Sequence, residues 1–311
     1  MQTVRNLLRN SVRFFNGNPA GIIGATIVAL ILVACLAAPV LTDKQPNKRV
    51  ARGHQPPSAE LILGSTRAGK DVYTQILYGG RVSLMVAFSA AAVTTAIALT
   101  AGVSSGYFGG RTDEIMMAVT NVMLVFPQLP LLIILAAFLG QVGPVVIALI
   151  LGLTSWPWGA RVMRSQTLAL RNKEFVTAAE VMGETKLRII FVEIIPNLIS
   201  LVAGMFVGTS LYAIGAQAGL EFLGLGDPTV VSWGTMLYWA QSSAAFYVGA
   251  WWDFVAPGTV IALMGGGLAL LNISIDQVSN PKLRTGRYLA TWKRLKAEIE
   301  AKRRQIGHTD P

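Results

Sequence analysis

Six apolar stretches, each long enough to cross a lipid bilayer, constrain this chain more than any other feature. A helix needs about 20 apolar residues to cross roughly 30 Å of hydrocarbon. Of the 311 residues, 53% are hydrophobic and only 14% are charged, a balance that soluble domains rarely approach. We therefore predict an all-α membrane protein whose six transmembrane helices lie near residues 20–41, 82–106, 115–139, 143–163, 194–219 and 254–275.

The distribution of Lys and Arg outside these stretches predicts the orientation of the chain. Basic residues concentrate on the cytoplasmic side of membrane proteins, and an even number of spans places both termini on one side. Both terminal segments and the loop 164–193 are basic, so we expect them in the cytoplasm, whereas the aromatic loop 221–253 has no Lys or Arg and is expected outside. The predicted units are a cytoplasmic N-terminal segment, a first helix, an external loop, a five-helix core and a basic cytoplasmic tail, at 1–19, 20–41, 42–81, 82–275 and 276–311.

One loop disagrees with this orientation. The external loop 42–81 contains seven basic residues, although some of them lie far from the ends of the spans, where the tendency weakens. In the tail, Tyr288 to Gln305 has the pattern of a basic amphipathic helix that could lie on anionic lipid.

The longest polar interruption in the second half of the chain lies between the fourth and fifth spans, from Glu174 to Asn197. Phe175, Ala178, Ala179 and Met182 recur at helical spacing and predict a short helix with one small apolar face. Gly183 follows, and glycine takes the left-handed conformation that ends a helix without steric cost. Such a helix has too little apolar area for a core of its own, and it is suited to the groove of a soluble partner.

The predicted spans contain no Asp, Glu, Lys, Arg or His in their interiors. Ion-coupled transporters generally keep an ionisable group at depth because it carries the coupling. Neutral polar residues are present instead, and we take Asn121, Gln128, Thr209, Tyr212 and Gln217 as candidates for a translocation path. Energy is therefore expected to arrive through a cytoplasmic partner, although backbone carbonyls can bind sodium without carboxylates.

Two local patterns suggest other chemistry, and neither is favoured. Cys35 and the residues before it fit a lipoprotein cleavage box, but the apolar run continues beyond the cysteine. The segment from Gly64 to Asp71 is close to a phosphate-binding P-loop, but Asp71 replaces the Ser or Thr that binds Mg²⁺. His54 and His308 lie far apart without companion ligands, so we predict no metal site, no cofactor and no nucleic-acid partner.

Several motifs, in order along most of the chain, resemble the permeases of ABC importers, in the dipeptide, oligopeptide and nickel branch. In the loop motif Ala178, Ala179 and Gly183 match, while Thr177 stands where the family has Glu. The remaining matches are Leu63 to Ser65, Gly69 to Val72, Leu77 to Leu84, Phe222 to Gly226, Ser232 to Gly234, Trp251 to Trp252, Ile195 to Asn197, Pro257 to Gly258 and Asn280 to Arg284.

The resemblance implies a C-type permease subunit, not an enzyme, in a prokaryotic cell membrane. Such a subunit works with a second homologous permease, two cytoplasmic ATP-binding subunits and an extracytoplasmic substrate-binding protein. The aromatic loop 221–253 would then help to gate the path, or it is a half-buried helix that covers the bundle. The residues implied in ATPase coupling are Glu174, Phe175, Thr177, Ala178, Ala179, Glu180, Met182, Gly183 and Pro196.

The substrate stays open at this point. The branch that the motifs resemble carries short peptides, nickel complexes, glutathione and oligosaccharides. Another class of protein, a secondary transporter or channel that acts alone, is the alternative. Uptake by the purified chain in liposomes without ATP or partner subunits would support that alternative.

Overall fold

The structure is a computed structural model that describes residues 18–279, 292 and 295–296. Within the described residues it consists of helices and loops, without a β-strand. The helices are α2 (Pro19–Leu36), α3 (Ala38–Leu41), α4 (Val72–Phe108), α5 (Gly110–Val125), α6 (Gln128–Leu139), α7 (Pro144–Thr154), α8 (Trp156–Arg171), α9 (Glu174–Val181), α10 (Lys186–Arg188), the π-helix η1 (Ile189–Ile194), α11 (Ile195–Phe222), α12 (Trp233–Ser242) and α13 (Trp252–Ser279). The predicted all-α class is confirmed for this part of the chain.

Four helices in the described part are long and apolar enough to cross a membrane, and six spans result if two bent pairs each count as one. The pair α5 and α6 is bent by 83°, and the pair α7 and α8 by 41°. Both bends coincide with proline: Pro127 lies between α5 and α6, and Pro157 lies in the first turn of α8. Proline lacks a backbone N–H and clashes with the preceding turn, so it favours a break at these places.

The second apolar helix begins at Val72 rather than near residue 82. Asp71 caps it, because its carboxylate accepts hydrogen bonds from the backbone N–H of Thr74 at 3.3 Å and from the Thr74 hydroxyl at 2.6 Å. Arg81, expected at the edge of an external loop, therefore lies within α4, where its guanidinium donates to the carbonyl of Cys35 at 2.7 Å. The Arg81 contact fastens α4 to the end of α2.

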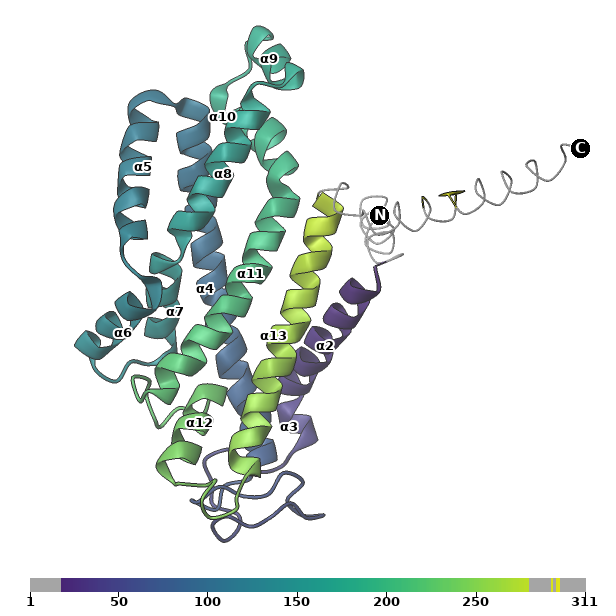
Figure 1. Ribbon diagram of the computed structural model, residues 1–311, viewed down its shortest axis with the longest axis vertical. Coiled ribbons are helices and arrows are strands. Elements are labelled where there is room, and N and C mark those ends of the chain that lie inside the picture. Colours follow the sequence, from purple (N-terminus) through teal and green to yellow (C-terminus); the bar gives the residue numbers. More distant parts are fainter. Residues whose placement is uncertain (1–17, 280–291, 293–294, 297–311) are drawn as a thin grey trace, which may run out of the picture.

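Helix α4 is the centre of the bundle. It packs against α7, α8 and α11, while α13 lies along α2 (Figure 1). Glycine permits a close approach between α2 and α13, since a Cβ on Gly24 would lie 2.6 Å from the carbonyl oxygen of Gly267. The main apolar core joins α4, α6, α7, α11, α12 and α13, and it includes Leu132, Ile147 and Met264.

The two ends of the bundle carry different structures (Figure 1). One end carries α9 and α10, and the described chain ends at residues 18 and 279 point toward it. The other end carries the loop 42–71, α3 and α12. The aromatic loop 221–253 thus contains a helix, α12, whose Trp233 is buried in the core, while Tyr247 and Trp251 are exposed. The basic N-terminal arm and the amphipathic segment predicted for the tail lie outside the described residues.

Candidate functional site

Helix α9 ends as its sequence predicts. Gly183 has a φ of +79°, in the left-handed region that favours glycine. The N–H of Gly183 donates to the Glu180 carbonyl at 3.0 Å, and the N–H of Glu184 donates to the Ala179 carbonyl at 3.1 Å. These paired bonds form a Schellman motif, which satisfies the last carbonyls of the helix.

The inner face of α9 packs into a second apolar cluster, separate from the main core. Val176 and Ala179 are buried there. Their neighbours come from α4, α8, η1 and α11. We call this the α9 cluster; it consists of Val103, Tyr107, Met163, Val176, Ala179, Ile189, Ile190, Ile194 and Leu198. A displacement of α9 would therefore act directly on α4, α8 and α11 through packing.

The buried face of α9 is rotated from the predicted one. Ala179 was expected on a single face with Phe175, Ala178 and Met182, but it faces inward with Val176, while the other three are exposed. Periodicity identified the helix, but it did not identify which of two adjacent apolar arcs is buried. The choice depends on where α4 and α8 lie.

The outer face of α9 and the turn after it form an exposed apolar surface. Met182 is 74% exposed and Phe175 is 40% exposed. Val181 of the same helix and Leu187 of α10 are also exposed. Glu174 and Thr177, two polar residues of the predicted coupling site, are exposed on the same helix. Glu180 accepts a long hydrogen bond of 3.4 Å from the Tyr107 hydroxyl. Thr177 donates to the carbonyl of Lys173 at 3.4 Å, within its own helix. Apolar side chains clustered at a protruding tip are typical of a docking surface.

Pro196 lies at the start of α11, the helix that corresponds to the fifth predicted span. It occupies the first turn of α11, immediately after the π-helix η1. A π-turn is a wide turn that often accommodates a disturbed hydrogen-bond ladder. The Asn197 side chain donates to the carbonyl of Glu193 at 2.6 Å and so satisfies one acceptor in this irregular turn.

An ion pair braces the same end of the bundle. The guanidinium of Arg164 on α8 contacts the carboxylate of Asp113 on α5 through two nitrogens, each 2.5 Å from an oxygen. Ser105 of α4 also donates to Asp113. Bidentate contacts of this kind fix geometry as well as charge, so α4, α5 and α8 are held together at this end.

A cavity of about 420 Å³ is bordered by α4, α6, α8, α11 and α13. We call it the polar cavity because polar side chains of α4, α6, α11 and α13 line it, between apolar ones. Three of the predicted path residues, Gln128, Thr209 and Tyr212, line it. Gln128 donates to the Ser155 hydroxyl across the cavity wall at 2.7 Å. The Tyr212 hydroxyl and the Asn272 side-chain oxygen are buried without a hydrogen-bond partner. Unsatisfied polar atoms at a cavity are suited to water or to a polar solute.

The two other predicted path residues lie elsewhere. Asn121 is exposed on α5 and accepts a hydrogen bond from Arg161 at 2.7 Å. Gln217 is buried toward the far end of α11, where it donates to Glu221 at 3.0 Å. Sequence reasoning also missed Asp276, which lines the cavity one residue beyond the predicted end of the sixth span. A carboxylate just past an apolar stretch was the available signal.

No group of three or more His, Cys, Asp or Glu side chains suitable for a metal occurs among residues 18–279. The candidate site consists of the exposed helix α9, the α9 cluster that supports it and the polar cavity, and all three involve α8 and α11.

The proteins that are similar to this chain agree in the family to which they belong. Residues 98–285 match the family described as "binding-protein-dependent transport system inner membrane component". A protein named a putative peptide transport system permease from Brucella abortus biovar 1 is 32% identical over 286 residues, covering 91% of this chain and 92% of the relative. The oligopeptide permease OppC of Bacillus subtilis is 29% identical, with 90% and 91% coverage. The dipeptide permease DppC of the same species is 32% identical, with 86% and 83% coverage.

The helical arrangement is also known. A chain of the inward-facing methionine ABC transporter MetNI superposes with a TM-score of 0.50 at 19% identity, covering 66% of this chain and 94% of that chain. At this identity the likeness concerns the fold alone. The family match over most of the bundle, together with relatives that align over nearly the whole chain, establishes that this chain belongs to the inner-membrane components of binding-protein-dependent transport systems.

Proposed function

We propose that this chain is the permease subunit of an ATP-driven importer for short peptides, with its α9 end in the cytoplasm. The names of the relatives support the peptide class. Oligosaccharides, nickel complexes and glutathione are the alternative substrates within the same class of importer. The observation that carries the proposal is that α9 presents an exposed apolar face while its other face is packed on α4, α8 and α11.

In this proposal α9 is the coupling helix. Phe175, Ala178 and Met182 contact a groove of a cytoplasmic ATP-binding subunit, and Gly183 sets the turn that holds them at the tip. Val176 and Ala179 transmit the displacement to the α9 cluster. Thr177 bonds within its own helix, so the contact is predominantly apolar and does not rely on a salt bridge at that position.

The polar cavity is proposed as part of the translocation path. Gln128, Thr209 and Tyr212 would contact the solute together with Asn272, because all four line the same space. Asn121 and Gln217 are assigned to structural contacts instead. A second, homologous permease would complete the path, with two ATP-binding subunits inside, a substrate-binding protein outside and lipid around the remaining apolar surface.

Labelling of single cysteines tests the orientation. In a Cys35→Ala background, one cysteine is placed at the exposed Met182 and another at Tyr247, which is 94% exposed at the opposite end. A membrane-impermeant maleimide added to intact cells should label position 247 and should reach position 182 only after permeabilisation. Labelling of position 182 in intact cells contradicts the proposal.

Reconstitution tests the function. The chain is placed in liposomes with its partner permease, ATP-binding subunits and binding protein, and uptake of the dipeptide Ala-Phe is followed. We expect uptake that requires internal ATP and every partner. Equal uptake by this chain alone would instead support a stand-alone transporter or channel, and ATP-driven uptake of an oligosaccharide or nickel complex but not of peptide would reassign the substrate.

A further inference from the structure

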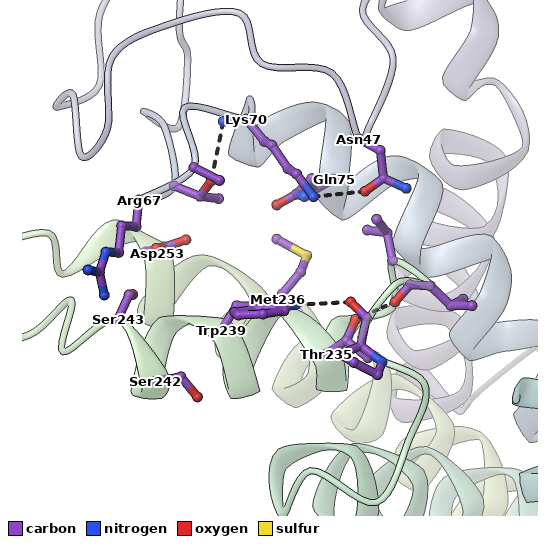
Figure 2. Close-up of a pocket in the computed structure, with 15 residues that line it drawn as sticks. Asn47, Arg67, Lys70, Gln75, Thr235, Met236, Trp239, Ser242, Ser243 and Asp253 are labelled. Atoms are coloured by element: carbon purple, nitrogen blue, oxygen red, sulfur yellow. Dashed lines mark hydrogen bonds between the residues drawn. The ribbon is translucent and has the colours of Figure 1, made fainter. Parts of the chain in front are cut away.

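A second cavity, of about 470 Å³, lies at the end of the bundle opposite α9. Its walls come from the loop 42–71, the first turn of α4, the segment before α12, α12 itself and the first turn of α13 (Figure 2). The volume is within the range of about 300–1,000 Å³ that is usual for small-molecule sites. Neither the docking helix nor the polar cavity of the bundle extends to it.

Hydrogen bonds hold these walls in place. The indole N–H of Trp252 at the start of α13 donates to the Ser65 carbonyl at 3.2 Å, which fixes the loop against that helix. The indole N–H of Trp239 donates to the Pro228 carbonyl at 3.0 Å. The ammonium of Lys70 donates to the Asn47 side chain at 2.9 Å (Figure 2). The cavity is therefore preformed, which lowers the entropic cost of binding.

Asp253 is the unusual group in this cavity. Asp253 is only 2% exposed. Among the described residues, nevertheless, none donates a hydrogen bond to its carboxylate and no Lys, Arg or His nitrogen lies within 4.0 Å of it. Figure 2 shows the side chain directed into the cavity. Its place in the first turn of α13 gives partial compensation from the helix dipole. A buried carboxylate otherwise needs a donor or a cation, and a ligand with an ammonium group would supply both.

Positive charge and apolar surface line other parts of the same cavity. Arg67 and Lys70 come from the loop 42–71, and neither forms an ion pair with Asp253. Met236 and Trp239 of α12 provide the apolar wall. Separated acidic and basic groups in one cavity are complementary to a ligand that carries both charges. A purely anionic ligand would leave Asp253 uncompensated, and a purely cationic one would meet Arg67 and Lys70.

We propose that this cavity binds a short peptide with both termini free. The peptide ammonium contacts Asp253, the carboxylate is held by Arg67 and Lys70, and a side chain packs on Met236 and Trp239. The chemistry of the cavity points to a zwitterion, and the choice of a peptide among zwitterions rests on the proposed function. The site would hold a peptide at the outer mouth of the permease, before it enters the path.

Calorimetry on the intact transporter without its binding protein tests this site. The complex in lipid nanodiscs is titrated with Ala-Phe, N-acetyl-Ala-Phe and Ala-Phe amide. Ala-Phe should bind with one site per copy of this chain. Acetylation, which removes the ammonium, should weaken binding at least about 30-fold, as expected for loss of one partner of a buried charge pair. The amide should bind more weakly than Ala-Phe by a smaller factor, because the cationic side of the cavity is less buried.

Matched variants connect the binding to the residues. Asp253→Asn should reduce the affinity for Ala-Phe at least about 30-fold, whereas Asp43→Asn, which changes an exposed carboxylate of the same end outside the cavity, should leave it unchanged. Lys70→Gln should bring the affinities for Ala-Phe and its amide closer together. Unchanged thermal unfolding of the Asp253 variant shows that the loss is not a failure to fold.

Three results overturn the inference. The first is absence of Ala-Phe binding at millimolar concentration, and the second is equal binding of the free and the acetylated peptide. The third is normal peptide binding by Asp253→Asn together with loss of binding-protein association. That third result would assign the cavity to a basic side chain of the binding protein. The proposed function is tested separately by ATP-driven uptake. Uptake without Asp253-dependent binding overturns this inference alone, whereas Asp253-dependent binding without ATP-driven peptide uptake overturns the proposed function alone.

Discussion

At the α9 end of the bundle, a short helix is held by apolar packing, whereas the opposite end is held by hydrogen bonds from buried polar side chains. The α9 cluster consists of aliphatic side chains with one tyrosine and one methionine. At the other end, Glu221 accepts hydrogen bonds from Gln217 and Ser232, and Trp233 donates to the Ile76 carbonyl at 3.0 Å. Apolar packing tolerates small sliding movements, but buried hydrogen bonds are directional and costly to break. The comparison suggests that one end transmits motion and the other keeps its shape.

The largest expected effect separates the two faces of α9. Ala179→Glu places a charge in the α9 cluster, so it should abolish ATP-driven uptake and expose the segment 172–190 to protease. Ala178→Glu changes the exposed face alone, and it should abolish uptake and ATPase association while the segment stays protected. Both variants should insert into the membrane at normal levels.

Gly183→Asp is a third test of that tip. The space around Gly183 is open, so only the left-handed backbone opposes the substitution, at a cost of about 1 kcal/mol. Because the turn at Gly183 sets the orientation of α9, we expect the variant to insert into the membrane normally but to lose ATP-driven uptake. Full uptake by any one of these three variants contradicts the assignment of α9.

The next largest effect is expected on stability, at the end of the bundle opposite α9. Trp233 is completely buried, so Trp233→Ala should lower the free energy of unfolding by about 3–5 kcal/mol. Trp251→Ala, at a residue 54% exposed, is the matched control and should change it little. Thermal unfolding of the purified protein followed by tryptophan fluorescence gives the comparison. Similar losses in the two variants would mean that this end is not packed as described.

A smaller effect is expected for the buried acid beside it. Glu221→Ala leaves Gln217 and Ser232 without their acceptor and should cost about 2–3 kcal/mol of stability. Glu221→Gln keeps the volume and part of the hydrogen bonding, so it should recover at least half of that loss. If Gln is as damaging as Ala, the negative charge rather than the hydrogen bonding stabilises this end.

The smallest effect is expected in the polar cavity between the ends. The hydroxyl of Tyr212 is buried without a partner, so Tyr212→Phe should change stability by less than about 0.5 kcal/mol or raise it slightly. Uptake should fall a few-fold if the hydroxyl contacts the solute. Asn121→Ala, outside the cavity, should not change uptake, and the reverse pattern would move the path to the α5 surface.

Much of the fold was predictable because membrane helices depend on local composition. The apolar runs gave the helices, the prolines at 127 and 157 coincide with the observed bends, and Gly183 gave the end of α9. The buried face of α9, the early start of α4 and the distant location of Asn121 and Gln217 were not predictable. Each depends on which helices become neighbours, and Asp71 begins α4 early through a cap that a hydropathy pattern does not contain.

The sequence by itself determined the helical class, the apolar segments that are candidates to cross a membrane and the short exposed helix after the fourth of them, because backbone satisfaction in lipid leaves a chain of this composition few alternatives. The tertiary structure alone decided that Val176 and Ala179 anchor that helix, and that Asp253 shares a cavity with Arg67 and Lys70 from a loop far away in sequence. Burial and charge compensation arise between segments distant along the chain, so they are fixed only when the helices pack.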